Sequence, residues 1–421
     1  MATLEATTDR AELTERIKSE AHAVGFDLVG VSTIGPATHP DDFRRWLAAG
    51  NYRPMDKLAQ NVEIRTDPRV RHPWARSVIA LAVRYDAQGV AEETDAGLAE
   101  QATVEPLAVP PMACDVPGIG PEDWTRRPPE ARARAQAILK RSPALGAWPW
   151  IARYERGANY HRINDGRLHR FVARVRRLVE EPVQVQPVIE HDAFFERDLA
   201  YQGGLGWIGK NNLLIHPRDG SFFALTSIFT DLELEPDSLV ADHCGSCTAC
   251  LDACPTHALD GPYNIVIERC LSARSISIDG PVPEVYVDTQ AGHLSGCDIC
   301  QDVCPFNRKH GGSPDVIPPP PARWSEATIL DLLACDEGER RLLFAGSLVG
   351  RIPLDMIKRN AALIAGRILR AARGNQARES LDLIATEVDP QDLPALRAAV
   401  ESLLDAQTPT VRDAAAWALA Q

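Results

Sequence analysis

The sequence lacks any run of about 20 uninterrupted apolar residues, the length that a membrane-spanning helix requires. Its amino terminus contains neither an apolar stretch nor a twin arginine, so it does not resemble an export signal. These two absences predict a protein without a membrane anchor that stays in the reducing cytoplasm. Disulfide bonds are not expected in that compartment.

The sequence also has fewer positively charged than negatively charged residues. The 421 residues include 45 Lys and Arg against 58 Asp and Glu, which gives a formal net charge of −13. A protein this acidic does not attract nucleic acid by its overall charge, so any such contact requires a local basic face. The hydrophobic and charged fractions, 45% and 24%, are those of an ordinary globular protein, and the length allows two or three domains.

Cysteine, in contrast, is concentrated in one part of the chain. Residues 244–255 read C-x₂-C-x₂-C-x₃-C-P, the bacterial ferredoxin spacing for a [4Fe–4S] cluster. Residues 297–305 repeat the last three cysteines and the proline, and Cys270 is the one candidate for the missing leading cysteine. In two-cluster proteins the fourth cysteine of a run binds the other cluster. We therefore expect two clusters, one held by Cys244, Cys247, Cys250 and Cys304, the other by Cys270, Cys297, Cys300 and Cys254.

Structural zinc is the alternative for these cysteines, because CxxC pairs are common zinc ligands. Zinc sites take four ligands, usually as two separated pairs, and do not require the x₃-C-P ending twice. The spacing therefore favours iron–sulfur clusters and predicts an electron-transfer module. Cys114 lies far from these cysteines along the chain, and we give it no chemical role.

The part of the chain before the cysteine runs, residues 1–236, predicts a mixed α and β domain. Residues 77–83 form a continuous apolar run, typical of a strand buried on both faces. Alternation and periodicity predict further strands at 26–31, 183–188, 213–215 and 222–229, and helices within 10–25, near 43–47, and at 168–179 and 194–201. Residues 86–147 differ in character and are interpreted as an insertion or lid.

The chain after residue 236 divides into two parts. Residues 237–310 hold the cysteine runs and predict a ferredoxin-like module, and residues 311–321, with four consecutive prolines, predict a stiff linker. Residues 322–421 show helical periodicity throughout. Residues 408–419 resemble the signature of HEAT-type repeats, whose two-helix units must stack to bury their apolar faces. We thus expect an α+β multidomain protein with an α-helical, HEAT-like carboxyl-terminal domain.

Residues 204–211 form a glycine-rich segment, Gly-Leu-Gly-Trp-Ile-Gly-Lys-Asn, that matches G-x-G-x-x-G. A nucleotide site with this motif needs a strand before the glycines and a helix after them. Here the predicted order is reversed, and Asn211 replaces the Ser or Thr that would hold Mg²⁺. A nucleotide site is therefore not favoured, and a glycine-lined approach to some large flat ligand is left open.

Several motifs together resemble the epoxyqueuosine reductase family. They are Arg153-Tyr154, Asn159-Tyr160-His161, Asp192 with Glu196-Arg197, the segment 204–211, the two cysteine runs with Cys304-Pro-Phe-Asn307, and the HEAT-like tail. The likeness covers nearly the whole chain except residues 86–147. The combination is highly specific, although each motif alone is not.

The resemblance implies both cofactors and a reaction. The family is similar in its core to the cobalamin-dependent reductive dehalogenases and is described as binding base-off cobalamin beside the first of two [4Fe–4S] clusters. Its reaction removes the epoxide oxygen from epoxyqueuosine at the tRNA wobble position and gives queuosine. The chain has no D-x-H-x-x-G motif, the usual histidine donor to cobalt, which agrees with a cofactor bound without such a ligand. The implied cobalamin contacts, in residues 1–236, are Arg153, Tyr160, His161, Gly204, Gly206, Trp207, Gly209, Lys210 and Asn211.

Asp192 aligns with the family's proposed proton donor. Removing the oxygen takes two electrons and a proton on the leaving oxygen. An acid suited to this role needs a pKa raised toward neutrality by an apolar surround, and Phe194 and Phe195 stand close by in sequence. The alternative is that Asp192 only caps the helix expected to begin near residue 194.

A basic stretch in the tail predicts an RNA contact. Between residues 340 and 378 nine Lys or Arg residues accompany one acidic residue, Asp355. The spacing of the arginines on one expected helix allows at least two of them to share its outer face. We expect this stretch to grip the phosphates of the tRNA anticodon stem-loop through Lys358, Arg359, Arg367 and Arg370. The alternative is an ordinary solvated repeat surface.

Two other functions compete with this interpretation. A related cobalamin-dependent reductase of the reductive dehalogenase type, acting on a small molecule, would more often carry a twin-arginine signal and no helical-repeat tail. A non-enzymatic electron carrier would need only the ferredoxin-like module, which leaves residues 1–236 unexplained. An epoxyqueuosine reductase fits best, with an external electron donor such as a flavodoxin or ferredoxin.

Overall fold

The computed structural model describes residues 2–85, 150–156, 159–188, 193–287, 292–309, 328–373 and 391–421. Asp192, Cys114, the expected insertion at 86–147 and the proline-rich linker at 311–321 lie outside the described residues.

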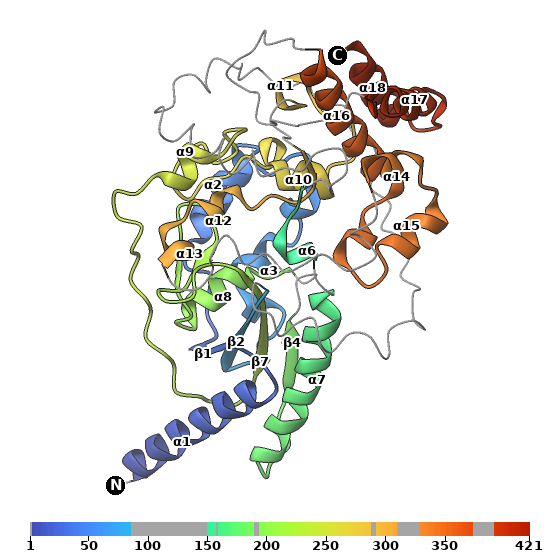
Figure 1. The fold of residues 1–421 in the computed structure, drawn as a ribbon. Coiled ribbons are helices and arrows are strands. Elements are labelled where there is room, and N and C mark those ends of the chain that lie inside the picture. The colour runs from blue at the N-terminus through green and yellow to red at the C-terminus, as the bar shows by residue number, and fades with distance from the viewer. Residues whose placement is uncertain are drawn as a thin grey trace.

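A four-stranded antiparallel sheet forms the centre of the amino-terminal part (Figure 1), in the order β1 (Leu28–Thr33), β2 (Ser77–Arg84), β7 (Phe223–Thr230) and β4 (Val185–Val188). The expected strand at 77–83 is confirmed as β2, whose first seven residues are all buried. Its odd-numbered side chains from Ile79 to Val83 enter one apolar cluster, while Val78, Ala80 and Ala82 enter clusters on the other face. Both faces of the sheet are therefore covered.

Helices on the two faces explain this burial. On one face, α1 (Ala2–Ala23) and α7 (Tyr160–Leu178) contact each other and pack Ile17, Phe171 and Val175 against the sheet. On the other face, α8 (Glu196–Gln202) approaches so closely that a Cβ on Gly30 of β1 would lie 1.9 Å from the carbonyl oxygen of Gly203. The domain is mixed α and β, as predicted.

Shorter elements complete this part of the chain. They are α2 (Pro40–Ala48), η1 (Asp56–Ala59), α3 (Val62–Thr66), η2 (Pro68–Val70), β3 (Trp150–Ile151), α6 (Arg153–Arg156), β5 (Trp207–Ile208) and β6 (Leu214–Ile215). One boundary differs clearly from the prediction, because α7 begins at Tyr160 and not near residue 168. The side chain of Asn159 accepts a hydrogen bond from the backbone N–H of His161 at 3.0 Å and caps the helix there.

The cysteine runs lie on short helices joined by loops. The elements are α9 (Ala249–Ala253), η4 (Ile267–Arg269), α10 (Leu271–Ile276), α11 (Glu284–Val287), β8 (His293–Ser295), α12 (Ile299–Asp302) and α13 (Pro305–Lys309). Helices α9 and α12, one from each run, contact each other, and β8 pairs in parallel with β3 of the preceding part. The module is thus attached to the amino-terminal part by a strand pair.

The described part of the tail is helical, as predicted. Its elements are α14 (Ile329–Ala334), α15 (Glu337–Leu343), η7 (Leu348–Arg351), α16 (Leu354–Ala372), α17 (Leu393–Glu401), η8 (Ser402–Asp405) and α18 (Pro409–Ala420). Helix α16 is central and contacts α14, α17 and α18 as well as β8 and α10. One apolar core joins Leu294 of β8 and Val287 of α11 to the tail helices.

The expected outer basic face of α16 is wrong for two of its four residues. Arg359 is only 1% exposed, and its guanidinium donates hydrogen bonds to the carbonyl oxygens of Arg274, Ile278 and Gly280. Arg367 is 4% exposed. Lys358 and Arg370 are half-buried. The prediction failed because α16 is covered on several sides, whereas the spacing argument assumed one solvent-facing side.

Among the described residues, we find no helix with the length and hydropathy needed to cross a membrane.

Candidate active site

Four cysteines from the two runs gather in a first set. Burial raises the pKa of the Cys250 thiol to about 12, and the nearby thiols of Cys244, Cys304 and Cys247 raise it further. Cys304 and Cys244 also share an apolar cluster around Trp207. The folded chain therefore brings together the first set that the spacing predicts, although Cys304 lies 54 positions beyond Cys250 in the sequence.

The other four cysteines gather in a second set. The pKa of Cys300 is raised well above its usual value, chiefly by burial and then by the thiols of Cys254 and Cys270. Burial raises the pKa of Cys297 in the same way, with Cys300 and Cys270 contributing. Cys254, Cys270 and Cys300 share an apolar cluster that Cys250 also contacts. The two sets thus lie next to each other across α9.

The first set includes Cys247, the one exposed cysteine among the eight in the two sets. Cys247 is exposed, whereas Cys254 of the second set is buried. Trp207 donates a hydrogen bond from Nε1 to the Sγ of Cys244 at 3.4 Å. The ammonium group of Lys210 donates to the carbonyl oxygens of Gly245 and Cys247 at 2.6 and 3.0 Å. Trp207 and Lys210, expected at a cobalamin site, thus contact the loop of the first cysteine set.

The glycines of segment 204–211 are explained by close packing of the chain on itself. Gly204 has φ +73°, and a Cβ there would lie 2.6 Å from the carbonyl oxygen of Ser238. A Cβ on Gly206 would lie 2.2 Å from the carbonyl oxygen of Ile215. Gly204, Gly206 and Gly209 do not line the cavity described next. The segment follows helix α8 and enters strand β5, the reverse of the order that a nucleotide site requires.

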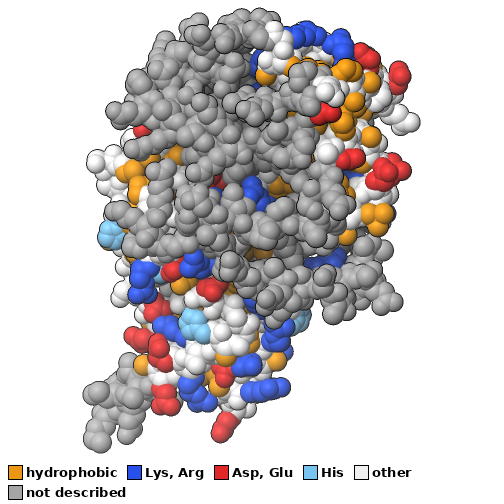
Figure 2. All heavy atoms as spheres, viewed as in Figure 1, with side chains coloured by type: hydrophobic (Ala, Val, Ile, Leu, Met, Phe, Trp, Pro, Cys, Tyr) orange, Lys and Arg blue, Asp and Glu red, His pale blue; other side chains and the backbone are white. Residues whose placement is uncertain are grey.

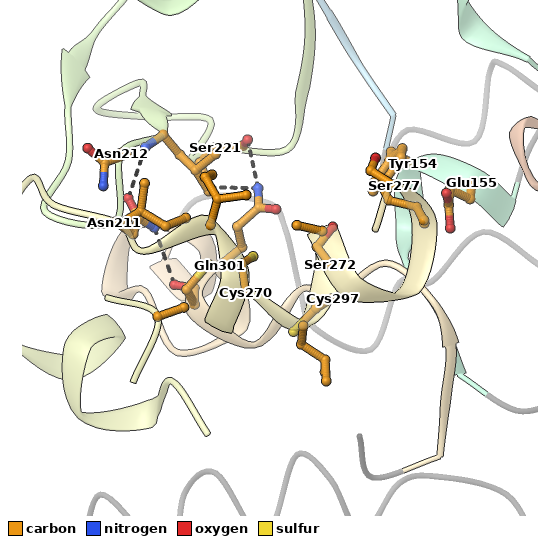
Figure 3. Close-up of a pocket in the computed structure, with 18 of the residues that line it drawn as sticks. Tyr154, Glu155, Asn211, Asn212, Ser221, Cys270, Ser272, Ser277, Cys297 and Gln301 are labelled. Carbon is orange, nitrogen blue, oxygen red and sulfur yellow. Dashed lines mark hydrogen bonds between the residues drawn. The ribbon is translucent and has the colours of Figure 1, made fainter. Parts of the chain in front are cut away.

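A cavity of about 700 Å³ opens beside the second cysteine set. Its walls come from Cys254, Cys270, Cys297 and Cys300, from β7, from η7 and from the start of α7. Figure 3 shows Asn211 and Asn212 at one end of the site, Tyr154 and Glu155 at the other, and Cys270 and Cys297 between them. This volume is in the range of cofactor and ligand sites.

Polar side chains fix one wall of the cavity. Gln301 donates from Nε2 to the carbonyl oxygen of Ser221 at 2.9 Å, and Asn211 donates from Nδ2 to the carbonyl oxygen of Cys300 at 3.4 Å. Asn212 also lines the cavity, and its Nδ2 is buried with no hydrogen-bond partner in the described part of the chain. A buried donor is normally satisfied, so Asn212 indicates a ligand with an acceptor at this place.

Tyr160 and His161 line the cavity where α7 begins. Their rings stack with centroids 4.4 Å apart. Of the expected cobalamin contacts, these two and Asn211 lie at the cavity, and the others do not.

Glu155 and Tyr154 are cavity residues that sequence reasoning missed. Burial raises the pKa of Glu155 to about 7, although hydroxyl groups of Ser295 and Tyr154 lower it. Burial also raises the pKa of Tyr154 well above its usual value. Tyr154 belongs to the Arg153-Tyr154 motif, but an acidic residue one position later carries no signal of its own. A carboxyl group that titrates near neutrality is suited to hold and release protons.

Arg153 has a different place from the one expected. Arg153 is 2% exposed, and its guanidinium pairs with the carboxylate of Asp302. The guanidinium also lies 3.9 Å from the carboxylate of Asp298. That carboxylate accepts a hydrogen bond from the backbone N–H of Arg153 at 2.8 Å. Its guanidinium lies over the ring of Phe222 at 4.4 Å. Arg153 therefore connects α6 to the loop of the second cysteine run. Asp298 and Asp302 were not predicted, although both stand inside that run.

Asp192 lies outside the described residues, and the description resumes at Ala193, just before α8. Phe194 is buried. The N-cap residue of α8 is Phe195, and no side chain caps this helix through a hydrogen bond. The two proposed roles of Asp192, proton donor and helix cap, both stay predictions.

A single-metal site is not seen in the described ranges, where no three or more His, Cys, Asp or Glu side chains are gathered to hold one ion.

The family model and the curated relatives that this chain matches agree with one another. The family model described as a 4Fe–4S double cluster binding domain matches residues 243–307. The chain is 28% identical over 413 residues to an epoxyqueuosine reductase of Alicycliphilus denitrificans, with 98% of each chain covered. It is 31% identical over 301 residues to an epoxyqueuosine reductase of Pseudomonas aeruginosa, with 71% of this chain and 70% of the relative covered.

A solved structure shows the same fold. It is a crystal structure of an epoxyqueuosine reductase with an epoxyqueuosine-modified tRNA-Tyr stem loop. The TM-score is 0.70 at 23% identity, and the match covers 97% of this chain and 89% of that one.

Proposed function

The chain belongs to the epoxyqueuosine reductase family, and from that premise we propose that it reduces epoxyqueuosine in tRNA to queuosine. The observation that carries the proposal is the cavity described above, which has four cysteines of the second set on one wall and Tyr160, His161 and Glu155 on others. Such a site receives electrons and holds a proton-carrying group in one place. Because its substrate is tRNA, we place the reaction in the cytoplasm.

The proposed reaction is a two-electron reduction. Two electrons and two protons convert the epoxide into an alkene and water, so both carbon–oxygen bonds of the epoxide break. The electrons come from an external one-electron donor such as a flavodoxin or ferredoxin. Each [4Fe–4S] cluster passes one electron at a time, and the protons come from acidic side chains near the reacting oxygen.

The two cysteine sets define an order for electron transfer. We propose one [4Fe–4S] cluster on each set. The first set includes the exposed Cys247 and the second lines the cavity, so electrons enter at the first and leave from the second. This order differs from the expectation that cobalamin lies beside the first cluster, because Cys254, Cys270, Cys297 and Cys300 border the cavity.

We propose that this cavity holds base-off cobalamin. The unsatisfied Nδ2 of Asn212 matches a carbonyl oxygen of the amide side chains that surround a corrin. Phe223, Ala224 and Leu225 of β7 supply an apolar wall. Tyr160, His161 and Asn211 are the residues of the sequence-based set that would hold the cofactor. When bound, cobalamin supplies a strongly reducing cobalt centre, while the protein supplies binding and orientation.

Asp192 is our candidate for the acid that protonates the leaving oxygen. The proposal rests on its motif, which aligns with the family's proposed proton donor. A carboxyl group in an apolar surround keeps its proton to higher pH and can then donate it.

We also propose three domains. Residues 1–236 bind cobalamin, carry the proposed acid Asp192 and contain an insertion at 86–147. Residues 237–310 form the ferredoxin-like two-cluster module. Residues 322–421 form the HEAT-like domain. The separate sheet in the first part, the family match at 243–307 and the helical tail support this division.

The direct experiment is anaerobic reconstitution with iron, sulfide and cobalamin, followed by assay on tRNA from a strain that accumulates epoxyqueuosine. We expect conversion to queuosine that depends on both cofactors and on a reductant. Protein that carries both cofactors and a reductant but leaves epoxyqueuosine unchanged would show that the substrate is another molecule.

A further inference from the structure

The surface of α7 carries a concentration of positive charge that the cavity chemistry does not use. The helix has 19 residues, among them six arginines and one acidic residue, Asp165. The whole chain has the opposite charge balance, with a formal net charge of −13. Such a local excess marks a surface for an anionic partner.

The arginines lie on the side of α7 that faces away from the sheet. Leu168, Phe171 and Val175 are buried against the sheet and α1. Arg162, Arg170 and Arg177 follow one another at intervals of about two turns, so they share the opposite side. All three are exposed, as is Arg176. In Figure 2, Lys and Arg side chains gather over the part of the surface where Figure 1 draws α7.

Half of these arginines are exposed and have no acidic partner among the described residues. Arg174 pairs with Glu20 at 2.6 Å, and His169 lies 3.6 Å from Asp165. Within the described ranges, Arg170, Arg176 and Arg177 make no ion pair. Since the apolar side of the helix is already buried, the basic side is not half of an amphipathic membrane anchor.

The position of α7 connects this basic side to the cavity. The helix starts at Tyr160 and His161, which line the cavity, and extends about 28 Å from there. A partner that lies along the helix therefore reaches the cavity at one end. An RNA stem fits this geometry, because its phosphates line its length and its loop bases can be splayed out at the end.

We propose that the exposed arginines of α7 hold the phosphates of the tRNA anticodon stem while the wobble base enters the cavity past Tyr160 and His161. The inference rests on the proposed function, and it moves the RNA contact from the largely buried basic stretch of α16 to α7. An acidic electron donor is the competing partner. It fits less well, because the exposed Cys247 belongs to the run that continues into α9, and Figure 1 shows α9 and α7 far apart on the molecule.

The test uses the full chain with its clusters reconstituted. Arg170, Arg176 and Arg177 are changed together to Gln, and the matched control changes Arg341, Arg373 and Arg397 of the tail to Gln. Both variants lose three positive charges; all the changed arginines are exposed except Arg397, which is half-buried. Binding of an epoxyqueuosine-modified anticodon stem-loop is measured by fluorescence anisotropy across a range of salt concentrations.

For the α7 variant we expect affinity weaker by about 30- to 100-fold near 0.15 M salt, and a log–log salt slope lower by about 2 to 3, since each phosphate contact contributes roughly 0.7–0.9. The tail variant should match the wild type, and iron content should be unchanged in both.

The possible negative results distinguish the proposed function from the inference about α7. If the wild-type protein neither binds the modified stem-loop nor reduces it, the proposed function is wrong. If the wild type binds and the α7 variant binds with the same affinity and slope, the α7 inference is wrong and the function stands. A variant that keeps RNA affinity but is reduced more slowly by a flavodoxin would assign the helix to the electron donor and overturn the inference.

Discussion

At the scale of single residues, Asp192 is the first position to change. Asp192→Asn removes the acidic proton and preserves the shape of the side chain. We expect turnover of epoxyqueuosine to fall by ~10²–10⁴-fold, the usual contribution of a general acid. Iron content and the visible spectrum of bound cobalamin should stay as in the wild type. Near-normal turnover would remove Asp192 from the chemistry.

Glu155 predicts a specific dependence of stability on pH. Burial raises its pKa from 4.5 to about 7, so the folded protein keeps a proton that the unfolded chain has released. The free energy of unfolding therefore falls as pH rises from about 4.5 to about 7, by about 3 kcal/mol from this group. Glu155→Gln should remove that loss, so the variant gains stability relative to wild type between pH 5 and pH 8.

The test measures the thermal unfolding midpoint of Glu155→Gln and of the wild type at pH 5 and at pH 8. The exposed Glu181→Gln variant is the control, and it should follow the wild type at both. If the midpoints of Glu155→Gln and of the wild type change equally between the two pH values, the Glu155 carboxyl group ionises as an ordinary glutamate does, and the prediction is wrong.

Residue-level prediction from the sequence is most direct where spacing alone carries the information. The cysteine sets follow from positions in two short runs, and the fold brings the same residues together. Trp207 and Lys210 were assigned to the cofactor because a motif does not show which way its side chains point. Glu155 was missed because its raised pKa comes from burial, which the local sequence does not record.

At the scale of elements, α16 attaches the tail to the cysteine module. Asn360 is fully buried and donates from Nδ2 to the carbonyl oxygens of Ser275 and Leu294 at 3.0 and 2.9 Å. Asn360→Ala leaves both carbonyls without this donor, so we expect a loss of about 2 kcal/mol or more in stability. Lys358→Ala on the same helix is the control and should change stability by roughly 0.5 kcal/mol or less.

The iron content of these two variants gives a second measurement. Ser275 lies in α10, directly after Cys270, and Leu294 lies in β8, shortly before Cys297. Asn360→Ala should therefore also lower iron retention at the second set during gel filtration. Equal stability and iron in both variants would show that the attachment is dispensable.

Element types were largely predictable, while their boundaries and surroundings were not. The buried strand β2 was readable because its apolar run is continuous. The start of α7 was placed too late because the decisive feature is one hydrogen bond from Asn159. The burial of Arg359 depends on carbonyl groups of a segment about 80 positions earlier, and no helical periodicity contains that information.

At the scale of the whole molecule, two cysteine sets predict about eight irons per chain, four for each cluster. Cys270→Ala should lower this to about four, because Cys270 belongs to the second set only. Iron analysis of anaerobically prepared protein checks both values. Full iron retention in Cys270→Ala would mean that another residue completes the second set.

The unequal exposure of the two sets has a consequence for oxygen damage. Cys247 of the first set faces solvent, whereas no cysteine of the second set is exposed, so we expect dissolved oxygen to reach a cluster held at Cys247 first. Protein handled in air should then lose the outer cluster while the inner one survives. Such a preparation would look half-loaded by colour and iron analysis, yet it would be cut off from its donor and fail to turn over. Activity in partly oxidised samples should therefore follow the outer cluster alone.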